Sequence, residues 1–559
     1  MSTRILIGAL TALLIASVLA APAAMAADWP QFHYDIANTG DSSSDAPDDN
    51  AMKWISDDIG AVKSSQAMIV DDKVFVYANS KVYALTKANG SVIWSASIPG
   101  DTSSFGSWAS PAYSNGMVFV SAGYNLTKIN ATNGSIVQQI AMPNGMYTCN
   151  GGPTVTGGRV FAGTYNPSWT GTDPASYYAF NESDLTDELW NFTVNAKYAT
   201  STPAVADGKV VVGENIYGAL SKLYCLNEVT GAEIWNTTLS KAICGSAAID
   251  AANDRVYVTT YNDGLLHALN LNNGNEVWNA TIIASDSTPA ISGDYIYVSG
   301  SNYGSATGRT YCFNSTGDEQ WNVSCGSWTM SPAVADGKLF TGTVGTSTGW
   351  YPDEVFYDGI NAYNALTGAA IWSHGSAGSS PSVSEDSSDD GMVVSIGIDG
   401  RVYAFGTTIQ TATITSCDDS GTAKDMFYPG DNVSVKGTGL AASTNYTLWI
   451  QNSPIGEGET LATGEDPSGS QVDVKTDASG NFAATTVWTN IPSGTQKEYD
   501  IVVDNKDDGS VGKYNEGSDG IDSVGTAGIV APVPELASAM LVGGGLLMLV
   551  GVMRLRRKD

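Results

Sequence analysis

One short module recurs eight times between residues 64 and 405, and this repeat constrains the fold more than any other feature of the sequence. A full copy holds a Ser/Thr-Pro-Ala step, a Gly-x-Val-Phe/Val run, a Val-Tyr-Ala-Leu run, an Asn-Gly or Thr-Gly pair and a Trp, and successive starts are 42 to 50 residues apart. Four short runs of alternating polarity between Gly-rich turns are typical of a four-stranded propeller blade and not of a helical solenoid. The sequence therefore predicts an all-β, eight-bladed β-propeller.

The copies differ in completeness. The clearest extends from Ser201 to Trp235, whereas the last begins at Ser380 and stops at Phe405 without its Trp. An orphan Trp54 lies upstream of the first copy, in Ala-Met-Lys-Trp-Ile-Ser. We expect this N-terminal strand to complete blade eight and close the ring, which removes the exposed edges of an open array. The aromatic segment before it, W-P-Q-F-H-Y, is expected to pack on the rim or a face of the disc as a lid.

These motifs, from the W-P-x-F-x-x-D-x-x-x-T-G opener to Phe405, resemble the family of pyrroloquinoline-quinone (PQQ)-type repeat propellers. The resemblance implies that the Trp ending each copy is a docking residue, which stacks against the next blade through the Gly of its own repeat. Blade two has Val137 at this place, so we expect a weaker contact there. The docking residues are Trp94, Trp190, Trp235, Trp278, Trp321 and Trp372.

The same resemblance introduces an enzymatic alternative. Quinoprotein dehydrogenases of this fold hold PQQ in the central funnel with calcium, a general-base Asp and a disulfide between adjacent cysteines. This chain has no Cys-Cys pair, and its histidines, His33, His267 and His374, show no metal-site or nucleophile spacing. We therefore expect no catalytic residues, no metal and no cofactor; PQQ and calcium belong to the alternative, a PQQ-dependent dehydrogenase. The cysteines are Cys149, Cys225, Cys244, Cys312, Cys325 and Cys417.

One face of the disc is the predicted binding surface. The loops between the second and third strands are long in copies three and seven, which lie opposite each other in a ring of eight, so they could meet over the funnel. Exposed rings beside carboxylates suit sugars or peptides; the alternative is that the rings only cover the loop bases. The candidate residues are Trp108, Tyr147, Trp169, Asp173, Tyr198, Trp328, Trp350, Tyr351, Asp353 and Glu354.

A different all-β pattern follows the repeats. Residues 408–508 alternate apolar and polar positions between Gly, Asn and Asp turns, as expected of an immunoglobulin-like β-sandwich. Asp504 and Asp508 are a weak calcium candidate, because an EF-hand register would put Lys506 at a ligand position. Residues 509–534 are rich in Gly, Ser and Asp, which predicts a flexible stalk.

Both ends of the chain carry export signals. Residues 1–26 show the basic, apolar and small-residue regions of a signal peptide. Residues 535–559 hold an apolar run closed by basic residues, as in a transmembrane helix, and with Val-Pro-Glu-Leu before it the tail resembles archaeal PEF-type sorting signals. Twelve N-x-S/T sequons, among them Asn133, Asn236, Asn279 and Asn432, fit an exported glycoprotein.

The net charge of −31 makes nucleic acid an improbable partner. The sequence thus predicts a propeller over residues 28–407, anchored at an envelope surface and acting as a non-catalytic binding or scaffolding module. Its expected partners are an envelope protein or glycan, the membrane through the C-terminal helix, and a sortase-like transpeptidase. The alternatives are the PQQ-dependent oxidoreductase and a self-assembling structural component of the envelope.

Overall fold

The computed structural model describes residues 28–406 apart from 62–64, 79, 99–109, 149–150, 167–171, 217, 262, 302–307, 327–328, 345–356 and 386–390, and residues 412–530 apart from further gaps. The chain divides into two compact units, one up to Thr408 and the other from Ile409. Among the described residues both units are built from strands, with a single short 3₁₀ turn at Pro143–Gly145.

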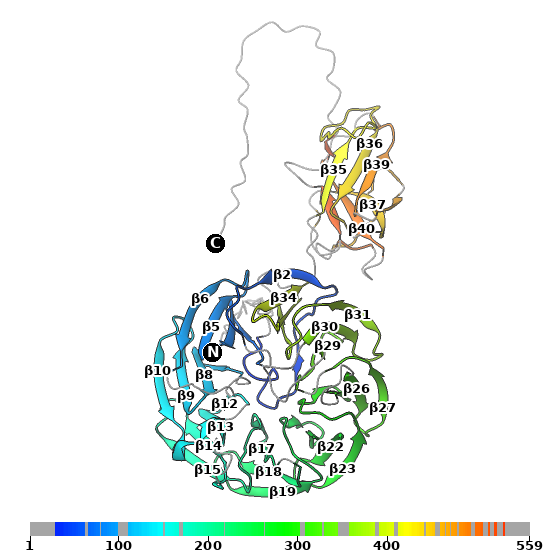
Figure 1. Cartoon of the computed structure of the whole chain (residues 1–559). Coiled ribbons are helices and arrows are strands. Elements are labelled where there is room, and N and C mark those ends of the chain that lie inside the picture. The colour runs from blue at the N-terminus through cyan, green and yellow to red at the C-terminus, as the bar shows by residue number, and fades with distance from the viewer. Residues whose placement is uncertain are drawn as a thin grey trace, which may run out of the picture. The chain divides into compact units, whose positions relative to one another are not determined.

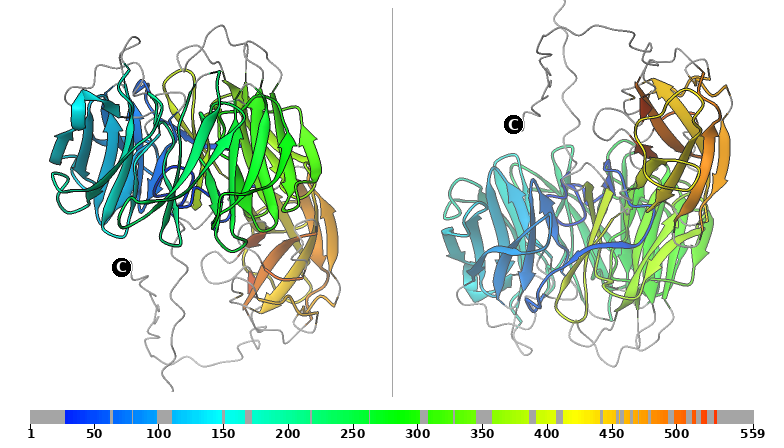
Figure 2. Two further views of the ribbon diagram at one scale, coloured as in Figure 1. Left: turned by 90° about the horizontal axis from the view of Figure 1, so that it is seen from below. Right: turned by 90° about the horizontal axis from the view of Figure 1, so that it is seen from above.

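The described part of the first unit forms eight sheets, arranged as blades around a central axis (Figure 1). Each blade has four antiparallel strands, and two of the sheets gain a fifth strand from outside the blade pattern. Figure 2 shows the same sheets from the side. Strands follow one another from the axis to the rim, as β3(Met68–Val70), β4(Lys73–Ala78), β5(Lys81–Thr86) and β6(Val92–Ser97) do in blade one. The next blades are β7(Ala112–Ser114), β8(Met117–Ala122), β9(Asn125–Asn130), β10(Ile136–Ala141); β12(Thr154–Thr156), β13(Arg159–Tyr165), β14(Ser176–Asn181), β15(Glu188–Thr193); and β16(Ala204–Ala206), β17(Lys209–Gly213), β18(Ser221–Asn227), β19(Glu233–Leu239).

Blades five to eight continue the ring in the same order. They are β20(Ala248–Asp250), β21(Arg255–Thr260), β22(Leu265–Asn270), β23(Glu276–Thr281); β24(Ala290–Ser292), β25(Tyr295–Ser301), β26(Gly308–Asn314), β27(Glu319–Val323); β28(Ala333–Ala335), β29(Lys338–Val344), β30(Tyr357–Asn364), β31(Ala370–His374); and β32(Ser382–Glu385), β33(Gly391–Ile396), β34(Val402–Gly406) with β2(Ala51–Ile55). The pairing of β2 with β34 confirms the predicted ring closure, in which the N-terminal strand is the rim strand of blade eight.

A β-bulge recurs in the rim strand of every blade and aims the docking residue. The register shifts immediately before Trp94 in blade one and before Trp235 in blade four, so that the preceding residue is left outside the ladder. The indole then turns toward the next blade, where its Nε1–H donates to a backbone carbonyl at 2.7–3.1 Å. These bonds join Trp54 to Lys87, Trp94 to Ala131, Trp190 to Glu228, Trp235 to Leu271, Trp278 to Ser315, Trp321 to Ala365 and Trp372 to Pro47.

Six of the seven indole rings, all but Trp372, cover a glycine. This glycine belongs to the next blade, which corrects the prediction that it belongs to the repeat of the Trp. Trp94 of blade one covers Gly134 of blade two, where an added Cβ would lie 2.6 Å from the ring. A side chain at that glycine would therefore push the two blades apart. The interface between blades eight and one, where the ring closes, has the same contact: Trp54 on β2 covers Gly90 of blade one.

The interface between blades two and three replaces this contact with a polar one. Counting from the turn glycine places Gln138, and not the predicted Val137, at the docking position; Val137 is the bulge residue and is exposed. The side-chain amide of Gln138 donates to the Asp184 carboxylate at 2.7 Å and accepts from the Leu185 N–H at 2.8 Å. Leu185 is fully buried. The missing indole is thus compensated by hydrogen bonds and by an apolar side chain from the partner blade.

The N-terminal segment occupies the centre of the ring, which corrects the prediction of a lid on the rim or face. This axial segment, residues 28–42, lies inside the ring in Figure 1 and ends as β1(Asp41–Ser42), parallel to β28. In seven blades the middle residue of the innermost strand donates its N–H to the axial segment at 2.6–3.3 Å. The donors are Ile69, Tyr113, Val155, Val205, Ile249, Ile291 and Val334, and the acceptors are Trp29, Pro30, Gln31, Ile36, Ala37, Thr39 and Gly40 in the same order.

The opener motif holds the axial segment in shape. The Asp35 carboxylate accepts the N–H groups of Ala37 and Thr39, each at 3.0 Å, and the Thr39 hydroxyl at 2.8 Å. His33 is fully buried, with Nδ1 2.6 Å from the carbonyl of Asn38 and Nε2 2.9 Å from that of Pro332. Gly40 has φ +66, and a Cβ there would lie 2.6 Å from the His33 ring, so only glycine fits.

The second unit contains two sheets that share a hydrophobic cluster including Phe427, Trp488 and Ile501. One sheet is β35(Thr413–Cys417), β36(Val433–Thr438) and β39(Phe482–Trp488); the other is β38(Val472–Lys475), β37(Asn445–Asn452), β40(Glu498–Asn505) and β41(Gly520–Asp522). β42(Ile529–Val530) also pairs with β40. β41 and β42 lie in the segment expected to be a stalk, so the second unit extends further along the chain than predicted.

Replacing a docking indole should destabilise the propeller strongly. Trp235→Ala removes a nearly buried ring and its bond to Leu271, and we expect it to lower the free energy of unfolding by about 3–5 kcal/mol. Ile234→Ala, at the exposed bulge position beside it, is the matched control and should change stability by less than about 1 kcal/mol. Denaturant unfolding of the full chain measures both; equal losses would contradict the docking role.

The axial segment gives a second, sharper comparison. Gly40 and Gly116 both have positive φ, but an added Cβ meets the His33 ring at the first and open space at the second. Gly116→Ala should therefore cost only the backbone strain, about 1–2 kcal/mol, whereas Gly40→Ala adds a clash at the axis and should cost clearly more. Thermal and denaturant unfolding of the two variants check this, and equal costs would contradict the close packing of His33.

Candidate functional site

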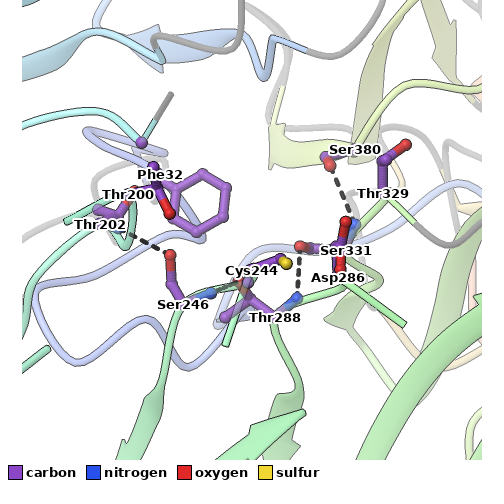
Figure 3. A pocket seen from close by; sticks show the side chains of 12 residues that line it. Phe32, Thr200, Thr202, Cys244, Ser246, Asp286, Thr288, Thr329, Ser331 and Ser380 are labelled. Atoms are coloured by element: carbon purple, nitrogen blue, oxygen red, sulfur yellow. Dashed lines mark hydrogen bonds between the residues drawn. The ribbon is translucent and has the colours of Figure 1, made fainter. Parts of the chain in front are cut away.

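The mouth of the central funnel is lined by one position of the repeat, three residues before the proline of the Ser/Thr-Pro step. In the described blades four to seven this position holds Thr200, Cys244, Asp286 and Thr329, and all four line a cavity of about 50 Å³ (Figure 3). Phe32 of the axial segment also lines it. The funnel is thus walled by hydroxyls, one thiol and one carboxyl.

The repeat position one residue before the proline joins neighbouring blades through a circle of hydrogen bonds. In five blades the backbone N–H at this position donates to the hydroxyl at the same position of the next blade, at 2.8–3.2 Å. The pairs are Gln66 with Ser110, Thr202 with Ser246, Ser246 with Thr288, Thr288 with Ser331, and Ser331 with Ser380, of which Figure 3 shows three. This explains the Ser/Thr in the repeat: these hydroxyls support the ring.

Asp286 is the only carboxyl among the residues that line the cavity. Burial raises its pKa to about 8, an effect that a hydrogen bond from the Cys244 thiol partly offsets. Burial, together with the neighbouring carboxylate, also raises the pKa of Cys244 well above its ordinary value, so the thiol is not activated as a nucleophile. Among the described residues, the Oδ1 atom of Asp286 is buried without a hydrogen-bond partner.

The described funnel residues do not fit PQQ with calcium. Sites for organic ligands enclose about 300–1,000 Å³, whereas this cavity measures about 50 Å³. The residues that line it include no Lys or Arg to pair with an anionic quinone. Within the described ranges there is also no group of three His, Cys, Asp or Glu side chains that could hold a metal ion.

Four tyrosines form a row at the C-terminal end of β13. The link from blade two to blade three pairs with one side of this end, and the link from blade three to blade four pairs with the other. β11(Tyr147–Thr148) pairs with that end on one side, and Tyr198 bridges Tyr165 on the other. Cross-strand neighbours place their side chains together, and the rings stack with centroids 4.0 Å apart for Tyr124 and Tyr147, 5.3 Å for Tyr147 and Tyr165, and 6.2 Å for Tyr165 and Tyr198. We call these four residues the tyrosine row.

The structure brings two of the predicted binding residues, Tyr147 and Tyr198, into this row. Asp173 is exposed, and its carbonyl accepts a hydrogen bond from the Asn166 side chain, next to Tyr165. The remaining candidates lie outside the described residues: Trp108, Trp169, Trp328, Trp350, Tyr351, Asp353 and Glu354. The meeting of the two long loops over the funnel stays a prediction.

Sequence reasoning missed Tyr124, Tyr165, Cys244 and Asp286. An alignment of the repeats on the Ser/Thr-Pro step would have identified the position three residues before the proline, because the residue type varies there while the Ser/Thr-Pro step repeats. The two tyrosines carry no such signal, because their row depends on which links pair with β13.

Two other candidates have structural partners. His267 is buried, and its Nδ1 lies 2.6 Å from Glu276 Oε1 and its Nε2 3.0 Å from the Thr260 hydroxyl. The carboxylate of the calcium candidate Asp504 accepts hydrogen bonds from the Trp449 indole and the Gly512 N–H. Its companion Asp508 lies outside the described residues.

The ring of eight sheets, the interblade indoles and the repeat define the class of the first unit as an eight-bladed β-propeller of the PQQ-repeat type. The family model described as outer membrane protein assembly factor BamB matches residues 45–186, 178–304 and 262–410, and the chain belongs to this family. No curated protein matches the sequence.

Solved structures show the same fold at low identity. The quinohemoprotein alcohol dehydrogenase from Comamonas testosteroni is similar with a TM-score of 0.56 and 13% identity, over 68% of this chain and 80% of the enzyme. One from Pseudomonas putida HK5 gives 0.55 and 12% over the same shares. A europium-containing methanol dehydrogenase gives 0.54 and 12%, over 68% of this chain and 98% of the enzyme. At such identity the likeness concerns the fold alone.

Asp286 gives the propeller a specific pH dependence. Because its pKa is raised in the folded chain, the folded state holds this proton more tightly than the unfolded state does, so its contribution to stability is complete below about pH 4 and is lost as the pH rises through about 8. Asp286→Asn should remove this loss. We expect the free energy of unfolding to fall less between pH 5 and pH 9 in this variant than in the wild type.

The matched control is Asp294→Asn, which changes an exposed carboxylate of the same blade. Its pH dependence should follow that of the wild type in the same denaturant titrations. If Asp286→Asn and Asp294→Asn have equal slopes, the buried carboxyl does not cause the effect.

Proposed function

We propose that this protein is a non-catalytic binding or scaffolding module of a cell envelope, exported by its N-terminal signal and anchored at the surface by its C-terminal tail. The non-catalytic part of this proposal rests on the axial segment, which lies in the centre of the ring and forms hydrogen bonds with seven blades. The cavity that the described residues line beside Phe32 has a volume of about 50 Å³, enough for a few water molecules.

The family supports the envelope part of the proposal. Its model is described as an outer membrane protein assembly factor, a description that refers to assembly at an envelope. The signal peptide, the sorting tail, the immunoglobulin-like assignment of the second unit and the membrane helix rest on the sequence. In the portion of the chain that the structure describes, we find no helix suited to crossing a membrane; the predicted span at 535–559 lies outside it.

The tyrosine row is the proposed contact surface for an envelope peptide or glycan. Tyr124, Tyr147 and Tyr198 are partly exposed, while Tyr165 is buried between two of them. Such a stack offers flat apolar area with hydroxyl groups at its edge, which suits sugar rings or extended peptide. Asp173, which is exposed and whose carbonyl accepts a hydrogen bond from Asn166 next to Tyr165, belongs to the same proposed surface.

The fold is also compatible with a PQQ-dependent oxidoreductase, because the similar solved structures include quinohemoprotein dehydrogenases. The deciding experiment is to incubate the purified full chain with PQQ and calcium and to record its absorption spectrum and dye-linked activity on alcohols and sugars. We expect no retained chromophore and no oxidation. A retained chromophore with turnover would overturn the proposal and make the funnel an active site.

Binding is tested next, with peptide and oligosaccharide arrays. Tyr147→Ala removes an inner ring of the row, and we expect it to weaken binding of any captured ligand by about twofold to tenfold, since one aromatic pair contributes about 0.5–1.5 kcal/mol. The control Tyr428→Ala removes an exposed ring of the second unit and should leave binding unchanged. Unaltered binding by Tyr147→Ala would contradict the site; concentration-dependent self-association without ligand binding would favour the structural-component alternative.

A further inference from the structure

The rim strands of four consecutive blades carry the same six-residue pattern, Glu-x-Trp-Asn-x-Thr/Ser. It reads ELWNFT in β15, EIWNTT in β19, EVWNAT in β23 and EQWNVS from the start of β27. In each case the residue after the docking Trp is the Asn of an N-x-S/T sequon. Four of the twelve sequons therefore occupy one structural position in blades three to six.

This position faces solvent on an open sheet edge. The asparagines Asn191, Asn236, Asn279 and Asn322 are exposed, and so are the Thr or Ser residues two positions later. Each rim strand is the last of its sheet, so its outer backbone groups have no neighbouring strand. A bulky group attached here meets no other part of the described ring.

The apolar residues beside these asparagines point to what such a group would do. The bulge that aims each Trp leaves the preceding residue exposed, and in three of the four strands that residue is aliphatic: Leu189 is 41%, Ile234 45% and Val277 46% exposed. Exposed aliphatic side chains on an unpaired strand edge favour edge-to-edge association between molecules. The sequon lies two residues away, on the other side of the buried indole.

The asparagine side chains are already held at the surface. The Nδ2 of Asn236 donates to Glu233 Oε1 at 2.6 Å, and the same bond joins Asn191 to Glu188 at 2.6 Å and Asn322 to Glu319 at 2.5 Å. An amide nitrogen that carries a sugar keeps one hydrogen, which is sufficient for this bond. The local geometry is therefore compatible with the modified side chain.

We propose that Asn191, Asn236, Asn279 and Asn322 are N-glycosylated and that the four glycans cover the exposed edges of blades three to six. The reaction needs a lipid-linked oligosaccharide phosphate as donor. The Asn Nδ2 forms a bond to the anomeric carbon, the bond from that carbon to the phosphate oxygen breaks, the amide loses one proton, and the lipid phosphate leaves. This inference rests on the proposed export, because such donors act on the exported side of a membrane.

Three of the other four blades also expose an aliphatic bulge residue, Ile93, Val137 or Ile371, so the contrast between the two sets of blades concerns the sequon alone. The rim strands of these other blades have Ser95, Gln139 or Ser373 after the docking position, and Ile55 on the closing strand, so none carries a sequon there. The chain continues toward the second unit from Gly406 in blade eight, within the four blades that lack the pattern. The glycans would thus occupy one half of the rim and leave free the half from which the chain continues.

Site-resolved mass spectrometry of the full chain purified from its own host tests the modification. We expect glycopeptides at the four rim asparagines and none at Asn125, whose N-L-T sequon lies on β9 with the side chain only 9% exposed. N-terminal sequencing of the same sample separates the two proposals. Unmodified rim asparagines in a chain lacking residues 1–26 overturn glycosylation and leave export standing, whereas unmodified asparagines in a chain that retains them overturn both.

A variant series tests the covering role. Thr193→Val, Thr238→Val, Thr281→Val and Ser324→Ala combined destroy the four sequons without changing the asparagines. The matched control changes the three threonines to serine and keeps every sequon. Light scattering of the first variant should show at least a twofold higher mean mass than the control at equal concentration. Equal masses with glycans absent from the first variant and present on the control would overturn the covering role.

Discussion

The backbone hydrogen bonds at the axis are the interaction on which the rest of this structure depends. The innermost strand of a propeller blade has one edge without a neighbour, and an unpaired buried N–H costs about 1–3 kcal/mol. Here one continuous segment accepts the N–H at the same position in seven blades. The centre is therefore closed by protein. Any recognition of a large molecule must take place above the funnel or on the rim, where aromatic and sequon positions lie.

At the rim the blades pack by a different contact, in which the aromatic side chain of one blade covers a turn glycine of the next. The interface between blades two and three is an exception that shows why the two partners occur together. Where blade two supplies Gln138, blade three supplies no turn glycine but Asp184 and buried Leu185, so both partners change together. In blade eight the two outer strands, β34 and β2, come from opposite ends of the propeller, so no turn joins them. Trp372 of blade seven therefore donates to the carbonyl of Pro47, in the N-terminal segment. Each interface thus satisfies the same packing and hydrogen-bonding needs with different residues.

The features that could be read from the sequence are those fixed by local pattern. Repeat length, alternation and the orphan Trp54 predicted the blades and the closing strand, because strand and turn preferences act within a few residues. The path of Trp29 to Gly40 could not be read in this way, since its partners are spread from Ile69 to Val334 and six of the seven contacts are made by backbone carbonyls, which every residue has. Val137 was mistaken for the docking position because the bulge shifts the register by one residue. The tyrosine row was missed for a related reason: Tyr147 and Tyr198 become neighbours only through Tyr165.

The closing strand and the axial segment have one further consequence, which concerns time. Residues 28–56 leave the ribosome well before the last strand of the ring, yet their partners include every blade, the last of them ending at Gly406. Neither the centre nor the interface where the ring closes can be completed until that residue has emerged, roughly 350 residues later. At about 5–20 residues per second this interval lasts about 20–70 s. Until then the blades already formed make a ring that is open at one end.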